Sequence, residues 1–341
     1  MGGLKKKNKK GRVLAFVLLA LPFLLFLVSL GIGTYGISPG GVIRTIVSFV
    51  SPSSRPDVPS AYRDILLRIR LPRLLLALAV GAALSVSGAS LQALFKNPLV
   101  NEYILGISSG AAFGAALSLV FLGRAFPPQI AAFVFAVIAV GAVLLISGRA
   151  ESHFISLLLT GIIVTAFFSA LLSLVEFFAS PYVLQSLFFW LMGSLSLASW
   201  KDLSISLPLI AVGLVILILL RWRLNVLSMS DEEARSLGVN VRREKMLVIG
   251  ATTLITAAGT SIVGIIGWLG FIVPHFVRLM FGADNRRVVP MSAAMGASVM
   301  LVADDIIRGL SSFEIPVGIF TSLVGIPIFL FLLKKTKKVW L

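Results

Sequence analysis

The stretch RWRLNVLSMSDEEARSLGVNVRREK, residues Arg221 to Lys245, is a charged island between two long apolar runs. Within it, Ser230 begins S-D-E-E, which joins a hydroxyl side chain suited to a helix N-cap with acids in the first turn. Gly238 follows A-R-S-L and is well suited to end that helix. The charges keep the island out of a bilayer, so we expect a short structured helix at a membrane face where a soluble partner docks.

The composition on either side of this island is that of a membrane protein. The chain is 58% hydrophobic and 13% charged, whereas soluble domains carry roughly a quarter charged residues. Apolar runs such as Val13–Leu30 and Ile205–Leu220 meet or approach the roughly 20 residues needed to cross a bilayer. The run near the N-terminus is too long for a signal-peptide core and predicts an uncleaved first span. We therefore expect one all-α, polytopic transmembrane domain over residues 1–341, with a short cytoplasmic tail at 1–12 and a cytoplasmic segment at 221–245.

The apolar pattern predicts about ten transmembrane helices. The region 246–281 would be roughly 54 Å long as a single helix, which exceeds a hydrocarbon core of roughly 30 Å. Its glycines and Pro274 offer break points, so two short helices are expected there. The predicted spans are 13–33, 72–95, 104–122, 128–147, 155–178, 203–220, 246–263, 265–281, 288–309 and 316–333.

The basic residues orient these spans. The formal net charge is +16, which could suggest nucleic acid, but the basic residues sit between apolar spans as the positive-inside rule requires. Most of them fall on the side that holds both termini and the 221–245 island, which predicts cytoplasmic N- and C-termini and no nucleic-acid partner. The basic residues predicted on the opposite side of the membrane concentrate in residues 34–73. That segment is either an interfacial amphipathic helix with snorkelling arginines or a docking patch for an acidic external protein.

Few ionisable residues fall inside the predicted spans, and those acids lie near helix ends. An ion-coupled carrier usually places acids near the bilayer midplane, so the energy for transport would come from elsewhere. Enzyme signatures such as H-E-x-x-H and the phosphate-binding G-x-x-x-x-G-K-[ST] are absent from the sequence, and cysteine is absent as well. We predict no catalytic residue and no metal site. An ion-coupled carrier and an intramembrane enzyme remain the alternatives. The intramembrane ionisable residues are Glu176, His275, Arg278, Asp304 and Asp305.

Ordered motifs over most of the chain resemble one family, the FecCD-like permease subunits of ABC importers for ferric siderophores, haem and cobalamin. The motifs begin with R-L-P-R, G-A-A-L-S-V-S-G-A-S-L-Q-A-L-F-K-N-P-L and L-G-I-S-S-G-A-A-F-G. The C-terminal half adds A-R-S-L-G-V, G-F-I-V-P-H-F-V-R-L, A-D-D-I-I-R and E-I-P-V-G. The resemblance implies the type II ABC importer permease fold, a homodimer in the cytoplasmic (inner) membrane of a prokaryote, and a pathway along the two-fold axis.

The same resemblance implies partners and roles for particular residues. Two cytoplasmic ATPase subunits would bind ATP and Mg²⁺, and an external binding protein would deliver the cargo, while this chain binds no cofactor. The coupling segment would be Asp231, Glu232, Glu233, Ala234, Arg235, Ser236, Leu237 and Gly238. Arg70, Arg73 and Arg308 would dock the binding protein, and Asn97, Pro98 and Leu99 would form part of a cytoplasmic gate. The candidates for the pathway lining are Thr160, Thr165, Phe168 and Ser169.

Overall fold

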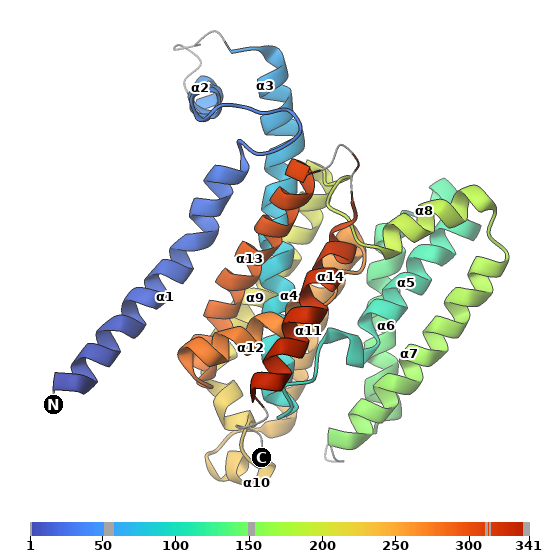
Figure 1. Cartoon of the computed structure of the whole chain (residues 1–341). Helices are drawn as coiled ribbons and strands as arrows, with labels where there is room; N and C mark the ends of the chain where they lie inside the picture. The colour runs from blue at the N-terminus through green and yellow to red at the C-terminus, as the bar shows by residue number, and fades with distance from the viewer. Residues whose placement is uncertain (1, 51–57, 149–153, 311–312, 314, 337–341) are drawn as a thin grey trace.

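The computed structural model describes residues 2–50, 58–148, 154–310, 313 and 315–336. Within these ranges the secondary structure is helical, and the long helices run side by side as a bundle (Figure 1). Arg55, one of the basic residues in the outer segment, lies outside the described residues.

Ten helical stretches correspond to the ten predicted spans. Seven are long and apolar enough to cross a membrane: α1 (Gly2–Ser29), α3 to α4 (Ser60–Leu94), α6 (Pro128–Ile146), α7 (Phe154–Phe177), α9 (Trp200–Leu227), α11 (Val241–Val263) and α13 (Asn285–Leu310). Three shorter apolar helices complete the set: α5 (Ile107–Leu117, continued by a π-helical turn to Leu122), α12 (Leu269–Phe281) and α14 (Val317–Thr336). The predicted all-α, polytopic fold is therefore confirmed.

Helix α4 is the most buried of these helices, and small residues let its neighbours approach it. A Cβ atom added at Gly88 would lie 1.7 Å from the carbonyl oxygen of Gly270 on α12. One added at Gly81 would lie 2.4 Å from the carbonyl oxygen of Gly296 on α13. In lipid, where apolar burial gives no drive for helix association, such close backbone contact supplies the packing energy. The small-residue face at 81–90 therefore holds the bundle together.

The N-terminal end of α4 differs from the prediction, which began this span at residue 72. Helical backbone already begins at Ser60 and passes through a π-helical turn, Ile65–Arg70, before α4 starts at Leu71. Pro72 has no N–H to donate to the preceding turn, and a π-helical turn is one way to absorb that lost hydrogen bond. The proline therefore changes the helical register without ending the helix.

The predicted division of residues 246–281 is confirmed, and the break falls at Gly264 and Gly267, two of the expected break points. Helix α11 ends at Val263, residues 264–267 are not helical, and α12 starts at Leu269. Gly264 and Trp268 both adopt left-handed φ angles, +75° and +73°. Pro274 lies inside α12 and does not break it. At 13 residues, roughly 20 Å, α12 is too short to cross a bilayer alone.

Two helices were not predicted as separate elements: α2 (Pro39–Val50) and α8 (Pro181–Leu191). Both begin with proline, whose fixed φ angle suits the first turn of a helix, but both are too short to give a spanning signal. Helices α2 and α3 (Ser60–Asp64) lie at the end of the bundle opposite the short helix α10 (Asp231–Ser236), and both chain termini lie toward the α10 end (Figure 1).

Candidate functional site

Helix α10 projects from the end of the bundle as a capped unit. The Ser230 hydroxyl accepts a hydrogen bond from the Glu233 backbone N–H at 3.2 Å, and the Glu233 carboxylate accepts one from the Ser230 N–H at 2.9 Å. This is the capping box that the sequence predicted. Ala234 is buried and anchors the helix, whereas Leu237 is 59% exposed. The helix therefore presents an apolar side chain and several charges to its surroundings.

The C-terminal end of α10 is a Schellman motif. The Gly238 N–H donates to the Arg235 carbonyl at 2.9 Å, and the Val239 N–H donates to the Ala234 carbonyl at 3.2 Å. Gly238 has a φ angle of +77°, which glycine adopts without steric cost. Gly238 terminates the helix as predicted, and Leu237, the last predicted helical residue, is its C-cap.

Asp231 joins α10 to two other elements. Its carboxylate accepts a hydrogen bond from Lys245 Nζ on α11 at 2.6 Å and lies 3.8 Å from Lys96 Nζ just beyond α4. Partial burial would raise the pKa of Asp231, but the bond from Lys245 and the charges of Lys245, Lys96 and Arg235 outweigh it. The pKa is therefore lowered from its ordinary value. Asp231 carries a full negative charge at neutral pH, between two cations from different helices.

The end of α4 repeats the Schellman motif with a lysine in the glycine position. The Lys96 N–H donates to the Ala93 carbonyl at 3.3 Å, and the Asn97 N–H donates to the Gln92 carbonyl at 3.1 Å. Lys96 has a φ angle of +51°, in the left-handed region that L-residues other than asparagine and aspartate seldom adopt. Lys96 therefore has both a strained backbone and a contact with Asp231, and it directly precedes the predicted gate segment.

The gate segment Asn97–Pro98–Leu99 is a tight turn. The Asn97 side chain accepts from the Leu99 N–H at 2.9 Å, and the Asn97 carbonyl accepts from the Val100 N–H at 3.3 Å. Val100 is fully buried, while Leu99 is 54% exposed. The turn is thus anchored on both sides by the bundle and exposes an apolar side chain in its middle.

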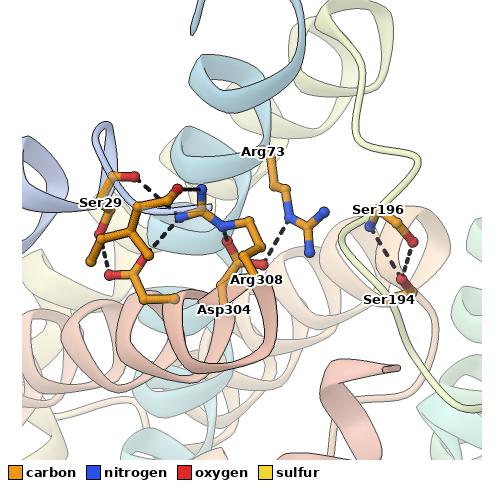
Figure 2. A network of polar contacts seen from close by, with 8 residues as sticks. Ser29, Arg73, Ser194, Ser196, Asp304 and Arg308 are labelled. Atoms are coloured by element: carbon orange, nitrogen blue, oxygen red, sulfur yellow. Dashed lines mark hydrogen bonds and ion pairs between the residues drawn. The ribbon is translucent and has the colours of Figure 1, made fainter. Parts of the chain in front are cut away.

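A second polar cluster lies at the opposite end of the bundle, where α1, α4 and α13 meet (Figure 2). Arg73 Nε lies 2.8 Å from Asp304 Oδ1, and Arg308 Nε lies 2.8 Å from Asp304 Oδ2. Asp305 accepts from Ser29 Oγ at 2.5 Å and pairs with Arg308. These side chains are almost wholly withdrawn from the surface. We call Ser29, Arg73, Asp304, Asp305 and Arg308 the outer arginine cluster.

The outer arginine cluster contains two of the three residues predicted to dock an external protein. The third, Arg70, is also buried and donates to the carbonyl oxygens of Leu30 at 2.7 Å and Tyr35 at 2.5 Å. All three guanidinium groups therefore bond within the chain in this conformation. Asp304 and Asp305, which the sequence placed at a helix end without a partner, supply the countercharge. Docking stays a prediction for these arginines.

The predicted pathway residues of α7 do not share one environment. Phe168 is buried and packs on Phe113 of α5 and Phe135 of α6, with ring centroids 5.7 and 6.5 Å apart. Thr160 is also buried, whereas Ser169 is exposed, and the hydroxyl of Thr165 is buried without a hydrogen-bond partner among the described residues. Their role in the pathway stays a prediction.

Glu102 is a buried acid that the sequence analysis missed. Glu102 lies in a short 3₁₀ turn, Glu102–Leu105, that follows the gate segment, and it is 1% exposed. Neither carboxylate oxygen has a hydrogen-bond partner in the described part of the chain. A Cβ atom added at Gly270 would lie 2.2 Å from Glu102 Oε2, so the carboxyl group packs against the first turn of α12. The sequence placed this residue in a loop, where an acid needs no explanation.

The sequence matches one family of transport proteins over most of its length. The model of the FecCD transport family matches residues 19–335, and the chain belongs to that family. A Helicobacter pylori protein named "Probable iron chelatin transport system permease protein" is 42% identical over 82% of this chain and 85% of its own length. The molybdate import system permease protein MolB of Haemophilus influenzae is 36% identical over 91% of this chain and 92% of its own.

A solved structure agrees with the whole arrangement. Its description reads "An inward-facing conformation of a putative metal-chelate type ABC transporter", and it superposes with a TM-score of 0.85 at 35% identity. The match covers 95% of this chain and 99% of the solved chain. The chain is therefore a multi-pass membrane protein with the fold of an ABC importer permease.

Proposed function

We propose that this chain is the membrane-spanning subunit of an ATP-driven importer that moves a bulky metal chelate into the cytoplasm along the axis of a homodimer. The observation that carries the proposal is α10, a six-residue helix fixed by a capping box and a Schellman motif, with Leu237 exposed at its end. Two cytoplasmic ATPase subunits, which hold the ATP and Mg²⁺, would each seat one α10. The α10 end of the bundle would then face the cytoplasm of a prokaryote, with both termini on that side.

The contacts of Asp231 support a route from the ATPase to the gate. A rigid-body shift of α10 would act on Lys96 through Asp231, and Lys96 is bonded directly to the gate segment through the backbone of Asn97. Lys245 would carry the same shift to the start of α11. Switches of this type work by moving packed elements between discrete arrangements, and an exposed ion pair is weak enough to be remade in each cycle.

Chelates are the proposed cargo because the Helicobacter pylori relative is named for an iron chelatin and the solved structure for a metal chelate, although the MolB relative is named for molybdate. Ferric siderophores, haem and cobalamin are the candidates. An external binding protein would deliver the cargo at the α2–α3 end. If Arg70, Arg73 or Arg308 takes part in docking, its guanidinium group must leave an internal carboxylate or carbonyl and bind an acceptor on the partner. This exchange would link docking to the packing of α1, α4 and α13.

The coupling role is tested by Leu237→Asp, which places a charge on the exposed apolar side chain of α10. With wild-type ATPase subunits in proteoliposomes, this variant should lose ATP-dependent chelate uptake and copurify less ATPase. Leu237→Met keeps the apolar contact and is the matched control, expected to transport normally. Full uptake by Leu237→Asp would show that α10 does not seat in the ATPase. Uptake without ATP that collapses with an ion gradient would instead identify a secondary carrier.

A further inference from the structure

The turn that carries Glu102 returns deep into the bundle after the end of α4. A Cβ atom added at Gly270 would lie 2.2 Å from Glu102 Oε2 and 2.9 Å from the carbonyl oxygen of Leu84, so both oxygens lie beside the same point of α12. Leu84 is ten residues before the end of α4 at Leu94, which is about 15 Å along the helix axis. A hydrocarbon core is roughly 30 Å thick, so Glu102 lies near the middle of the membrane.

This depth sets Glu102 apart from the acids that the sequence analysis considered, which lie near helix ends. An ionisable side chain inside a membrane is costly and marks ion or proton sites. The side chain of Glu102 is buried, and neither carboxylate oxygen accepts a hydrogen bond from any residue that the structure describes. The coupling through α10 gives this acid no role. What Glu102 can do depends on its charge, and its charge depends on the groups around it.

Five of the helices packed against the turn bring no charge to its depth. The turn contacts α4, α5, α6, α7 and α11. Helices α5 and α6 contain no ionisable residue. The charged residues of the other three lie near helix ends: Arg73 on α4, Glu176 on α7 and residues 242–245 on α11. These five helices therefore supply neither a cation nor a second acid at the level of Glu102.

Helix α12 and the turn itself hold the remaining ionisable groups, and none of them is bonded to Glu102. Arg278 donates to the side chain of Gln92 on α4. His275 Nε2 is buried and has no hydrogen-bond partner among the described residues. The hydroxyl group of Tyr103 lies against the segment that precedes α12. In this conformation Glu102 is therefore a buried carboxyl group without a countercharge.

A neutral carboxyl group fits this position better than an ionised one. An unpaired carboxylate in a medium of low dielectric constant loses its hydration without compensation. The positive end of the α12 dipole favours an anion, but its effect is small beside that loss while no N–H group donates to the carboxylate. A neutral carboxyl group can instead donate its own proton. The Leu84 carbonyl oxygen, which has a second lone pair besides the one used within α4, is placed to accept it.

An ionised Glu102 would find its donors on α12. The first N–H groups of a helix have no partner within that helix, and Trp268, the N-cap residue of α12, makes no side-chain capping bond. A carboxylate that moved toward this first turn would accept from those N–H groups and face the positive end of the helix dipole. The charge of Glu102 therefore selects between two partners, α4 when the group is neutral and α12 when it is ionised.

Water has a short route to this carboxyl group. A cavity of about 700 Å³ lies between the turn, the segment 265–268, the end of α8 and α14. Asn101 and Tyr103, the residues on either side of Glu102, both line it. The described residues in its wall include no acid, no histidine and no cation. Water in the cavity is therefore the acceptor for a proton that leaves Glu102.

We propose that Glu102 is a proton-binding site at mid-depth in the bundle. In this conformation its carboxyl group is neutral and donates to the Leu84 carbonyl oxygen. When it gives its proton to water in the cavity, the carboxylate moves to the first turn of α12 and takes the turn Glu102–Leu105 with it. The gate segment ends three residues before Glu102, so this exchange makes the position of the gate depend on pH. The site goes beyond the proposed function, since it needs neither a cargo nor the ATPase subunits.

Infrared spectroscopy tests whether the carboxyl group is neutral. The full-length chain in lipid nanodiscs is measured from about pH 6 to about pH 9, a range in which buried carboxyl groups release their protons. We expect the C=O stretching band of a protonated carboxyl group at the lower pH and the loss of most of it at the higher pH. Glu102→Gln keeps the shape of the side chain and a donor for the Leu84 carbonyl but cannot ionise, so it should remove this band. Asp64→Asn, at an exposed ion pair of the outer end, is the control and should leave the band unchanged.

Two spectra would overturn the proposal. The first is a spectrum of Glu102→Gln identical to that of wild type at the lower pH, which would mean that Glu102 is ionised in this conformation. The second is a band that keeps its full intensity at the higher pH, which would mean that the proton is never released. If Glu102→Gln does not fold, Glu102→Asp gives the same decision, because a protonated aspartic acid should displace the band in frequency without removing it.

Hydrogen exchange, followed by mass spectrometry, tests the movement of the turn. At the higher pH the amides of residues 101–105 should exchange several-fold faster in wild type than in Glu102→Gln, because leaving α4 opens the turn to the cavity. At the lower pH the two proteins should exchange these amides at the same rate. Each comparison is made at a single pH, so the intrinsic effect of pH on exchange cancels, and peptides from α6 serve as the internal control. Equal exchange at both pH values would show that the charge of Glu102 does not move the turn and would overturn the proposal.

These outcomes are separable from the proposed function, because both measurements use the chain without ATP, ATPase subunits or cargo. A pH-dependent carboxyl band and exchange difference without ATP-dependent uptake would leave the proton site standing and reject the importer. ATP-dependent uptake of a chelate without the band would leave the importer standing and reject the proton site.

Discussion

The two ends of the bundle both carry ion pairs, but they differ in burial. At the outer end the side chains of Arg73 and Asp304 are 6% and 0% exposed. At the α10 end those of Lys96 and Asp231 are 41% and 38% exposed. Removing one member of a buried pair leaves an unpaired charge in a medium of low dielectric constant, whereas an exposed pair is already solvated. The buried pair of Arg73 and Asp304 is therefore suited to stay fixed, and the exposed pair of Lys96 and Asp231 is suited to be remade.

The largest effect is expected from Asp304→Ala. This change leaves Arg73 and Arg308 buried beside each other with one carboxylate fewer, and it should destabilise the protein by about 3–5 kcal/mol. The loss is measured by thermal unfolding of the purified chain in nanodiscs. Asp64→Ala, which removes the exposed pair with Arg68 at 3.3 Å, is the matched control and should change stability by less than about 1 kcal/mol.

The same variants bear on docking. If the outer arginine cluster is only structural, Asp304→Ala should lower the stability of the protein. The molecules that remain folded should then bind the external binding protein as tightly as wild type does. If Arg73 or Arg308 docks the partner, freeing them from Asp304 should strengthen association and steepen its dependence on salt. Equal stability of Asp304→Ala and Asp64→Ala, both at the outer end, would mean that burial does not decide how much an ion pair stabilises that end.

Variants at the α10 end should weaken the coupling of ATP hydrolysis to transport, with little change in the stability of the protein. Asp231→Asn removes the charge that faces Lys96 and Lys245, and unfolding should shift by less than about 1 kcal/mol. Lys96→Gly relieves the left-handed backbone and should leave stability equal or higher, since lysine in this region costs roughly 1 kcal/mol relative to glycine. Both variants should lower the amount of cargo moved per ATP hydrolysed, because the link from α10 to the gate segment is cut.

The control for this pair is Lys201→Gln, an exposed cation at the outer end, which should keep the wild-type ratio of transport to hydrolysis. The informative measurement is that ratio in proteoliposomes, because a purely structural role would change both rates together. A normal ratio in Asp231→Asn and Lys96→Gly would show that the contact between α10 and the end of α4 transmits nothing.

The comparison also shows what the sequence could predict. Helix α10 was predicted with both of its ends because its signals are local: Ser230, Glu233 and Gly238 lie within nine residues of one another. The ten spans followed from the lengths of the apolar runs, which are local signals as well. The break before α12 was found because glycines mark it.

The remaining features depend on contacts between residues far apart in the chain. Arg73 and Asp304 are separated by 231 positions, and nothing near either residue announces the other. The Schellman motif at α4 escaped notice because lysine stands where glycine is expected, so the local signal was missing. Glu102 was read as a loop residue because its burial is created by α12. The packed rings of Phe271 and Phe329 come from α12 and α14, which precede and follow α13 in the chain. Tertiary packing, which composition does not encode, made each of these sites.

The smallest expected effect is the pH dependence of the turn between α12 and α13, at the same end as α10. Asp284 accepts hydrogen bonds from Arg286 and, at 2.7 Å, from the Asn225 side chain of α9. The bond from Arg286, together with that from Asn225, outweighs partial desolvation and lowers the pKa of Asp284 to about 2. A carboxyl group with a depressed pKa stabilises the folded state above its ordinary pKa, and this contribution disappears as the pH falls from about 4 to about 2. Because the group is largely solvated, the change should be less than about 1 kcal/mol.

Asp284→Asn should remove that part of the pH dependence in thermal unfolding scans, and its stability at neutral pH should be slightly lower than that of wild type. Identical curves for the two proteins between pH 4 and 2 would mean that Asp284 and its turn add no pH-dependent stability.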